Sequence, residues 1–412
     1  MALARQGSDE GVAGKTEILV AGAGPAGLCA GLSLARGGRQ VLVAGPADTR
    51  ATARTVALFD GSVRFLQSLG VWDALATAAE PLTVMRIVDD TGSPFGAGPM
   101  DFRASEIGLD QFGFNIENAA LVEALEVTLA KEPLAERNRD LITEYAFGDD
   151  GVTGRLSGGG RIEARLVVAA DGRSSPAREA AGIKSRAWSY PQVAFTAILS
   201  HRQPHNNAST EFHTREGPFT LVPLPGTTEA PHRSSLVWMM HPASAKRLKA
   251  LSPEKLLGAI ERQSHFLLGA MSLERVGAFI PIEGLSARAM AAPRLALVGE
   301  AAHVFPPIGA QGLNLGLRDV AHLAECIEAT KPADAGDAAM LAAYERARRA
   351  DVGSRQIAVD ILDRSLLAGF LPIDLLRGAG MAALSRLASL RRMMMHEGVL
   401  PRFGAPRVMR SC

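Results

Sequence analysis

Three glycines near the N-terminus have the spacing of a phosphate-binding turn. The segment from Gly22 to Gly27 has the sequence GAGPAG. In such a turn the first glycine permits a sharp bend, the second lets the backbone approach a pyrophosphate, and the third lets a helix pack closely on a strand. The N–H groups at the start of that helix face the phosphates. We therefore expect a pyrophosphate to bind at Gly22, Gly24, Ala26 and Gly27.

A second chemical signal is the pair Asp171 and Gly172, which follows the apolar segment from Arg165 to Ala170. Ser174 or Ser175 can cap a helix that begins directly after the pair. An Asp-Gly pair alone indicates only a turn. It bears on ligand binding here because it occurs together with two glycine-rich segments.

The third and longest signal lies between Leu297 and Asn314, where LVGEAAH is followed closely by PPIGAQGLN. This order predicts a buried strand, an acid, a proline-stiffened bend, a glycine loop and a helix from about Leu313. Backbone N–H groups at the helix start can bind the electron-rich edge of a ring. The carboxylate of Glu300 can accept hydrogen bonds from sugar-alcohol hydroxyls. The expected ligand-binding residues of this segment are Gly299, Glu300, Pro307, Gly309, Gly312, Leu313 and Asn314.

The first glycine segment lies in the sequence context that such a site needs. Ile18 to Ala21 is an apolar strand, Leu28 to Arg36 a small-residue helix, and Val41 to Val43 a second strand. This order predicts a parallel sheet covered on both faces. The acid that normally follows the second strand and bonds a ribose is missing, because the strand continues as Ala44-Gly45-Pro46. Asp48 either takes that role or is an ordinary loop acid.

Later patterns predict a mixed architecture. Apolar residues spaced by three and four predict a helix from Arg54 to Leu69, and a second helix is expected from Ala119 to Ala130. Alternating apolar residues from Gln192 to about Trp238 predict an antiparallel sheet. Arg294 to Val298 then returns to a buried parallel strand, and the chain beyond Pro332 is helix-rich to about Gly398.

These patterns divide the chain into four regions. A disordered lead-in covers residues 1–15, and a C-terminal helical region covers 336–412. A nucleotide-binding domain is discontinuous and covers 16–80, 100–190 and 276–335. A β-sheet domain for the substrate is interleaved with it and covers 81–99 and 191–275.

The bulk composition limits the class of protein. Of the 412 residues, 47% are hydrophobic and 21% are charged, which allows a large core. A net charge of +1 gives no sign of a nucleic-acid partner. Cys29, Cys326 and Cys412 have no metal-ligand spacing, so we expect no metal site, a reducing compartment and a cytoplasmic protein. No apolar run approaches the roughly 20 residues of a membrane span, and Met1 to Lys15 lacks the apolar core of a signal peptide.

With these motifs, the chain from about Glu17 to Arg392 resembles the group A flavoprotein monooxygenases of the p-hydroxybenzoate hydroxylase fold. Within that group it is most similar to the ubiquinone-biosynthesis hydroxylases. The resemblance implies an α/β fold with added antiparallel β-structure: a three-layer, Rossmann-like FAD domain, an interleaved β-sheet substrate domain and a helical C-terminus. The segments that carry the resemblance most specifically are RTVAL at 54–58, FGFNIEN at 112–118, GAQGLNLGLRD at 309–319 and YERARRAD at 344–351.

The resemblance also implies roles for individual residues. Gly22, Gly24, Gly27, Asp171 and Gly172 would lie by the FAD pyrophosphate. Arg54 would lie near the phosphates or the ribityl chain, and Glu300, where the family usually has Asp, would hold the ribityl hydroxyls. Pro307 and Gly309 would flank the reactive ring edge, and backbone groups of Leu313 and Asn314 would bind its pyrimidine end.

The chemistry implied by the family is aromatic hydroxylation. NAD(P)H reduces FAD, dioxygen adds to form a flavin C4a-hydroperoxide, and one oxygen atom passes to a phenol ring. The sequence has no second strand–GxGxxG–helix unit for a nicotinamide nucleotide. Either the nicotinamide therefore visits transiently, or another protein donates the electrons. The sequence does not identify a catalytic acid or base.

The expected substrate is a polyprenylated phenol, which favours a quinone-biosynthesis complex and contact with the inner face of the membrane. The apolar segment from Leu371 to Met395 carries spaced arginines and is either a surface-bound helix or an ordinary packed helix. Three alternatives stay open: a hydroxylase of a soluble aromatic or polyketide, a flavin-dependent reductase or halogenase, and a non-catalytic flavin-binding scaffold. The Trp-x-Trp-x-x-Ile signature of halogenases is missing from the sequence.

Several other residues of types that could take part in catalysis are expected to have structural roles instead. His303 is expected to be structural because the task of its loop is to position the flavin ring. His201, His205 and His213 show no ligand spacing and are expected on the surface. Trp188 and Tyr190 could line a phenol site, although aromatic residues in a β-domain more often belong to the core.

Overall fold

The computed structural model describes residues 12–46, 52–92, 98–307, 309–331, 333–367, 387–399 and 404–410. One layer is a six-stranded sheet with the order β19-β20-β13-β2-β3-β9. The strands from β20 to β9 pair in parallel, and only β19 is antiparallel. The bounds are β2 Ile18–Ala21, β3 Val41–Ala44, β9 Ala135–Asn138, β13 Leu166–Ala169, β19 Ala291–Ala292 and β20 Leu295–Leu297.

Apolar residues explain why this sheet is an interior layer. Every residue of β2, β3 and β13 is buried, as expected for a parallel sheet covered on both faces. Helix α1 (Pro25–Arg36) packs closely on β3, because a Cβ added at Gly31 would lie 2.4 Å from a methyl group of Val43. Cys29 in α1 is fully buried. Helices α4 (Asn118–Leu129) and α8 (Gln311–Thr330) pack against α1.

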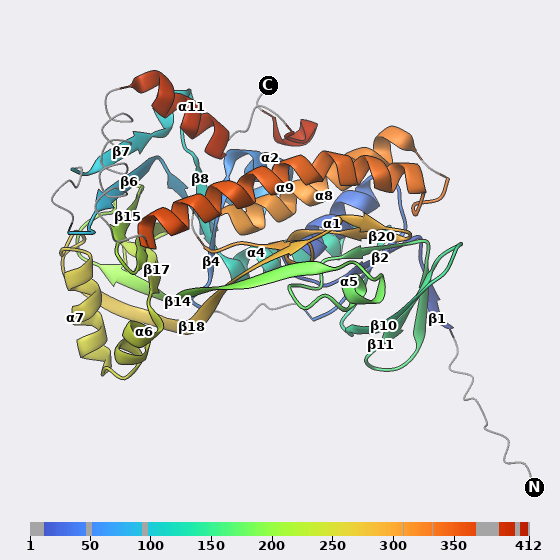
Figure 1. The fold of residues 1–412 in the computed structure, drawn as a ribbon, viewed down its shortest axis with the longest axis horizontal. Coiled ribbons are helices and arrows are strands. Elements are labelled where there is room, and N and C mark those ends of the chain that lie inside the picture. The colour runs from blue at the N-terminus through green and yellow to red at the C-terminus, as the bar shows by residue number, and fades with distance from the viewer. Residues whose placement is uncertain are drawn as a thin grey trace, which may run out of the picture.

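The second layer is an eight-stranded sheet with the order β21-β18-β14-β17-β16-β15-β6-β7. It confirms the predicted antiparallel segments. Its longest strands, β14 and β18, have 17 residues each and extend from this sheet toward the six-stranded layer (Figure 1). Helices α6 (Pro242–Lys249) and α7 (Pro253–Gln263) cover one of its faces. The strands are β6 Val84–Asp89, β7 Met100–Arg103, β14 Ser185–His201, β15 Ala208–Thr214, β16 Gly217–Leu224, β17 Arg233–Met240, β18 Met271–Ala287 and β21 His303–Val304.

A small three-stranded sheet corrects the predicted helix from Arg54 to Leu69. Its order is β4-β8-β5, with β4 at Thr55–Phe59, β8 at Gly113–Glu117 and β5 at Ala79–Leu82. Only the second part of the predicted helix is helical, as α2 (Asp60–Ser68). The prediction was wrong because antiparallel pairing with β8, from Thr55↔Glu117 to Phe59↔Gly113, decides the conformation, and local spacing contains no information about that partner.

The expected disordered lead-in is partly wrong as well. Its last residues form β1 (Val12–Lys15), which pairs in parallel with β12 (Arg161–Ala164) in a sheet with β11 (Val152–Leu156) and β10 (Ile142–Phe147). A backbone partner far along the chain orders this segment. Residues 1–11 lie outside the described part of the chain.

The C-terminal part contains α9 (Ala338–Leu367), which runs beside α8 (Figure 1), and α11 (Ala388–Val399). Short helices α3 (Trp72–Leu75) and α5 (Pro176–Ala180) complete the fold. Among the described residues no helix is long and apolar enough to cross a bilayer. Most of the segment from Leu371 to Met395 lies outside the described residues. The division into four regions stays a proposal. β7, which falls in the segment 100–190, pairs into the eight-stranded sheet, and so does the part of β18 beyond the boundary expected at residue 276.

Candidate active site

All three predicted motifs meet at one edge of the six-stranded sheet. β2, β3, β13 and β20 are parallel, so their carboxyl ends point the same way. Gly22 follows β2, Gly45 follows β3, Asp171 follows β13 after one residue, and Gly299 follows β20 after one residue. Ligands of open α/β sheets bind at this edge, so the fold brings the predicted residues to one place.

The three glycines of the first turn meet different demands. Gly22 has φ +108°, and a Cβ there would lie 2.2 Å from the carbonyl oxygen of Ala170. A Cβ at Gly27 would lie 1.9 Å from the carbonyl oxygen of Gly22. At Gly24, by contrast, a Cβ would meet nothing within 4 Å. Packing therefore requires two of the glycines, whereas the third borders open space at the start of α1.

The other two motifs also contain glycines that border open space. A Cβ at Gly172 or Gly312 would also have no neighbour within 4 Å. Gly24, Gly172 and Gly312 therefore leave room for a ligand to approach the backbone of three separate segments. This arrangement fits a dinucleotide such as FAD, whose pyrophosphate would lie at the start of α1.

Asp171 connects this edge to α5. Its Oδ2 accepts a hydrogen bond from the backbone N–H of Ala177 at 3.2 Å, and its buried Oδ1 has no partner among the described residues. Burial raises the pKa of this carboxyl group, while hydrogen bonds from Ser175 and Ala177 act in the opposite direction. Ser175 is the helix cap, as predicted, because its Oγ accepts from the N–H of Arg178 at 3.0 Å.

A buried polar network holds the third motif. Oδ2 of Asp319 accepts hydrogen bonds from the backbone N–H of Gly299 at 2.9 Å and from Nε2 of His303 at 2.7 Å. Oδ1 accepts from Nε of Arg348 at 2.7 Å. Burial alone would raise the pKa of Asp319, but His303 and Arg348 outweigh it and the pKa is lowered. The network fixes the turn at Gly299, and His303 lies inside it, which agrees with the structural role assigned to that ring.

The polar residue predicted for sugar hydroxyls is accessible. The side chain of Glu300 is 52% exposed, and its nearest cation is Arg173, with Nε 3.7 Å from Oε2. Pro307 and Gly309 are exposed, and Gly309 has φ +63°. Such positions suit residues that face a bound ring.

α8 begins at Gln311, two residues before the predicted start at Leu313. The side chain of Asn314 is fully engaged by the protein: Oδ1 accepts from the backbone N–H of Phe59 and from Oγ of Ser62, and Nδ2 donates to the carbonyl oxygens of Ala57 and Ala310. The family resemblance implies a ligand-binding role only for the backbone of Asn314, not for this side chain. The link from α8 to β4 was missed because it joins residues far apart in sequence.

Of two further predicted residues, Arg54 and Asp48, the structure describes only Arg54. Arg54 is exposed, and its carbonyl oxygen accepts from the N–H of Asn118 at 3.0 Å. Asp48 lies outside the described residues, so its ribose role is untested. Where the ribose acid was expected, Arg137 donates instead to the carbonyl oxygens of Val43 and Gly45, at 3.1 and 2.7 Å. That contact was unpredictable because Arg137 comes from the neighbouring strand.

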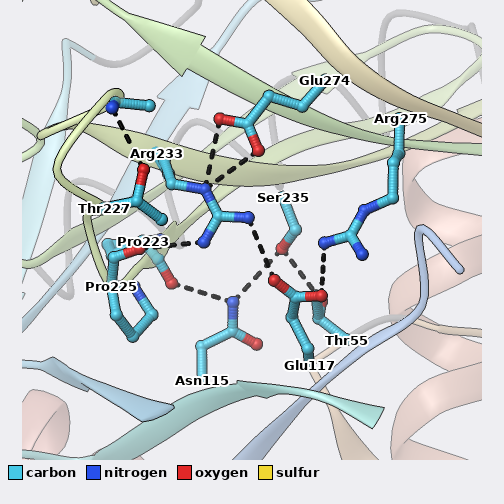
Figure 2. Close-up of polar contacts among 11 residues, drawn as sticks. Thr55, Asn115, Glu117, Pro223, Pro225, Thr227, Arg233, Ser235, Glu274 and Arg275 are labelled. Atoms are coloured by element: carbon cyan, nitrogen blue, oxygen red, sulfur yellow. Dashed lines mark hydrogen bonds and ion pairs between the residues drawn. The ribbon is translucent and has the colours of Figure 1, made fainter. Parts of the chain in front are cut away.

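A charged cluster joins the three-stranded sheet to the eight-stranded sheet (Figure 2). Arg233 donates to Glu274 at 2.9 Å and to Glu117 at 3.0 Å, and Arg275 also donates to Glu117. Thr55, directly after Arg54, donates to Oγ of Ser235 at 2.9 Å. The cluster therefore holds the Arg54 segment against β17 and β18.

We expect the substitution Arg233→Met to lower the free energy of unfolding by about 1–3 kcal/mol, because it leaves two half-buried carboxylates without their shared donor. Urea unfolding followed by circular dichroism measures the change. Arg247→Met, at an exposed arginine of α6, is the matched control and should stay within about 0.5 kcal/mol. Equal effects of both substitutions would contradict a special role for the cluster.

The prediction that His201, His205 and His213 lie on the surface was wrong, since even the side chain of His205 is only 11% exposed. His201 and His213 are each 7% exposed. Nε2 of His201 lies 2.9 Å from Oγ of Ser234, and Nε2 of His213 lies 2.7 Å from Glu211. Their polar partners allow this burial. The rings of Trp188 and Tyr190 contact each other edge to face, with centroids 6.3 Å apart.

Comparison with known proteins supports a flavin site at this edge of the sheet. Residues 15–357 match the family described as FAD binding domain. The chain belongs to this family. It is 34% identical to the ubiquinone hydroxylase UbiL of Rhodospirillum rubrum, covering 93% of this chain and 89% of that one. It is 30% identical to the 3-demethoxyubiquinol 3-hydroxylase of Escherichia coli, covering 92% and 96%.

The protein is thus an FAD-dependent monooxygenase. Among solved structures, the p-nitrophenol 4-monooxygenase PnpA of Pseudomonas putida is similar, with a TM-score of 0.77 and 18% identity. That match covers 94% of this chain and 99% of PnpA. It confirms the predicted flavin monooxygenase fold. Among the described residues no group of three His, Cys, Asp or Glu side chains could hold a metal ion.

Proposed function

We propose that this protein hydroxylates the aromatic ring of a polyprenylated phenol in ubiquinone biosynthesis. The observation that carries this proposal is the similarity, over nearly the whole chain, to relatives named ubiquinone hydroxylase and 3-demethoxyubiquinol 3-hydroxylase. The convergence of the three motifs at one sheet edge supports a flavin as the reactive group.

FAD, once reduced by NAD(P)H or another electron donor, supplies the dioxygen chemistry that side chains perform poorly. The protein's residues bind and orient. Gly24 and Gly172 would lie against the pyrophosphate, and the Glu300 carboxylate would accept hydrogen bonds from ribityl hydroxyls. Pro307, Gly309 and the backbone at Leu313 would flank the flavin ring. The eight-stranded sheet would exclude water from the reacting atoms.

We also propose contact with the inner face of the membrane, where a polyprenyl tail would lie, together with other proteins of quinone biosynthesis. Leu387, Met393 and Met394 of the α11 region are each more than half exposed. Arg392 beside them is exposed as well. Apolar and basic groups on one helix favour attachment to an anionic lipid surface. This proposal places the protein in the cytoplasm at the membrane.

The test is consumption of oxygen and NAD(P)H by the purified, FAD-loaded protein, with and without a short-chain prenylphenol. We expect substrate-stimulated consumption and a product heavier by one oxygen atom. Consumption without a hydroxylated product would overturn the prenylphenol assignment. Hydroxylation of a water-soluble phenol alone would favour the soluble-aromatic alternative instead.

A further inference from the structure

A cavity of about 260 Å³ lies between the edge strands of the eight-stranded sheet and the loop that follows β14. Its polar lining includes Arg86 and Arg103 from β6 and β7, His205 from the loop, and Ser234 from β17. The volume is slightly below the roughly 300–1,000 Å³ of drug-sized ligand pockets. It therefore suits one small molecule.

This cavity lies across the sheet from the candidate active site. Ser235 faces the flavin side, where its Oγ contacts Thr55 and Asn115 (Figure 2). Successive side chains of a strand point to opposite faces. Ser234 therefore faces the other side, where its Oγ lies against His201 and lines the cavity. The cavity is thus separate from the place proposed for the flavin and the phenol.

The charged groups of the lining leave one positive charge. Arg86 binds Asp101 with two hydrogen bonds of 2.7 and 2.9 Å, and Arg103 donates to the same carboxylate at 3.1 Å. The hydrogen bond from Arg86 lowers the pKa of Asp101, which therefore stays ionised near neutral pH. Burial lowers the pKa of His205 to about 4, so this ring is neutral there. Two guanidinium groups thus face one carboxylate.

Much of the remaining wall is apolar, although Asn206 and Thr210 also line it. Val84, Leu221 and Leu268 are buried and line the cavity, and the half-exposed Leu267 borders it. A strongly hydrated inorganic ion would gain little from such a wall, whereas a hydrocarbon group would be desolvated against it. The side chain of Arg103 is 58% exposed, so its guanidinium can meet a ligand that enters from solvent.

We propose that this cavity binds a small amphipathic monocarboxylate, with its carboxylate on Arg103 and its hydrocarbon part against Leu221 and Leu268. The class covers an aromatic acid with one ring or a short branched-chain acid. Arg103 gives the bidentate donor geometry that carboxylates prefer. The site does not depend on the reaction proposed for the flavin.

The probe for this site is benzoate, titrated calorimetrically into the FAD-loaded protein, with benzyl alcohol as its neutral counterpart. We expect benzoate to bind and benzyl alcohol to bind at least tenfold more weakly. Arg103→Gln should raise the dissociation constant for benzoate at least tenfold. Arg247→Gln, at an exposed arginine on α6, should leave it unchanged.

A second variant tests the cavity rather than the charge. Ala208 lines the cavity, and Ala208→Leu should fill it and abolish benzoate binding while the circular dichroism spectrum stays that of the wild type. Benzoate could also enter the flavin side, in which case the flavin absorption spectrum would shift and neither variant would matter. That result, or an absence of benzoate binding, would overturn the proposal. These experiments measure benzoate binding and not hydroxylation, so a failure of benzoate to bind would leave the proposed function standing.

Discussion

The substitution Asp319→Asn should lower the free energy of unfolding by about 3–5 kcal/mol, which is the range for breaking a buried ion pair by removing one charge. Asp319 is fully buried, and its carboxylate accepts hydrogen bonds from Gly299, His303 and Arg348. The variant would leave the cationic Arg348 with less compensation and loosen the turn at Gly299. Chemical unfolding of the apoprotein measures the loss, and weaker FAD binding should accompany it.

A control variant and a pH dependence make this expectation more specific. Glu283→Gln removes an ion pair to Arg173 whose side chains are 49% and 44% exposed, and it should cost less than about 1 kcal/mol. Because the pKa of Asp319 is lowered in the fold, its stabilisation is present above about pH 4 and is lost as the pH falls through the folded-state pKa. The variant should lack this acid-dependent part. A loss no larger than that of Glu283→Gln would rule out the network as the support of the third motif.

The substitution Gly24→Val should weaken FAD binding at least 100-fold, or about 2.7 kcal/mol, while the apoprotein stays folded. Gly24 has extended dihedral angles, φ −73° and ψ 176°, which valine adopts readily. A Cβ there meets no protein atom within 4 Å, so added methyl groups would occupy the space proposed for the pyrophosphate. Fluorescence titration of the apoprotein with FAD gives the dissociation constant, and thermal unfolding without FAD gives the stability.

Other glycines supply the matched comparison. Gly22→Val places a side chain at φ +108° against the carbonyl oxygen of Ala170, so the apoprotein itself should be destabilised. Gly353→Ala, in α9 with open space around its Cβ, should keep both folding and FAD affinity. If Gly24→Val unfolds the apoprotein as Gly22→Val does, packing rather than ligand space explains Gly24.

Part of the site was predictable because its requirements are local. A turn that needs positive φ at Gly22 and no side chain at Gly27 has a recognisable glycine spacing. The fully apolar strands β2, β3 and β13 indicate an interior parallel sheet. A helix cap at Ser174 or Ser175 was identifiable for the same reason, and Ser175 is the cap. These features depend on residues within a few positions of one another.

Other parts were not predictable because their partners are distant. The segment from Thr55 to Phe59 has helical spacing, but pairing with β8 makes it a strand. His201 and His213 were expected on the surface and are buried, because tertiary packing rather than local spacing decides the exposure of a strand residue.

The sequence by itself determined the nucleotide-binding βαβ unit and the two later motifs, because backbone conformation and apolar periodicity are set over short distances. The flavin monooxygenase class was indicated by the resemblance of those segments to a known family. Only the tertiary structure decided how those motifs are supported. Asp319 joins Gly299 to Arg348, Asn314 joins α8 to β4, and Arg233 joins β17 to Glu117. A buried charge or amide is stable only when its partners come together on folding, and chain order does not record which partners those are.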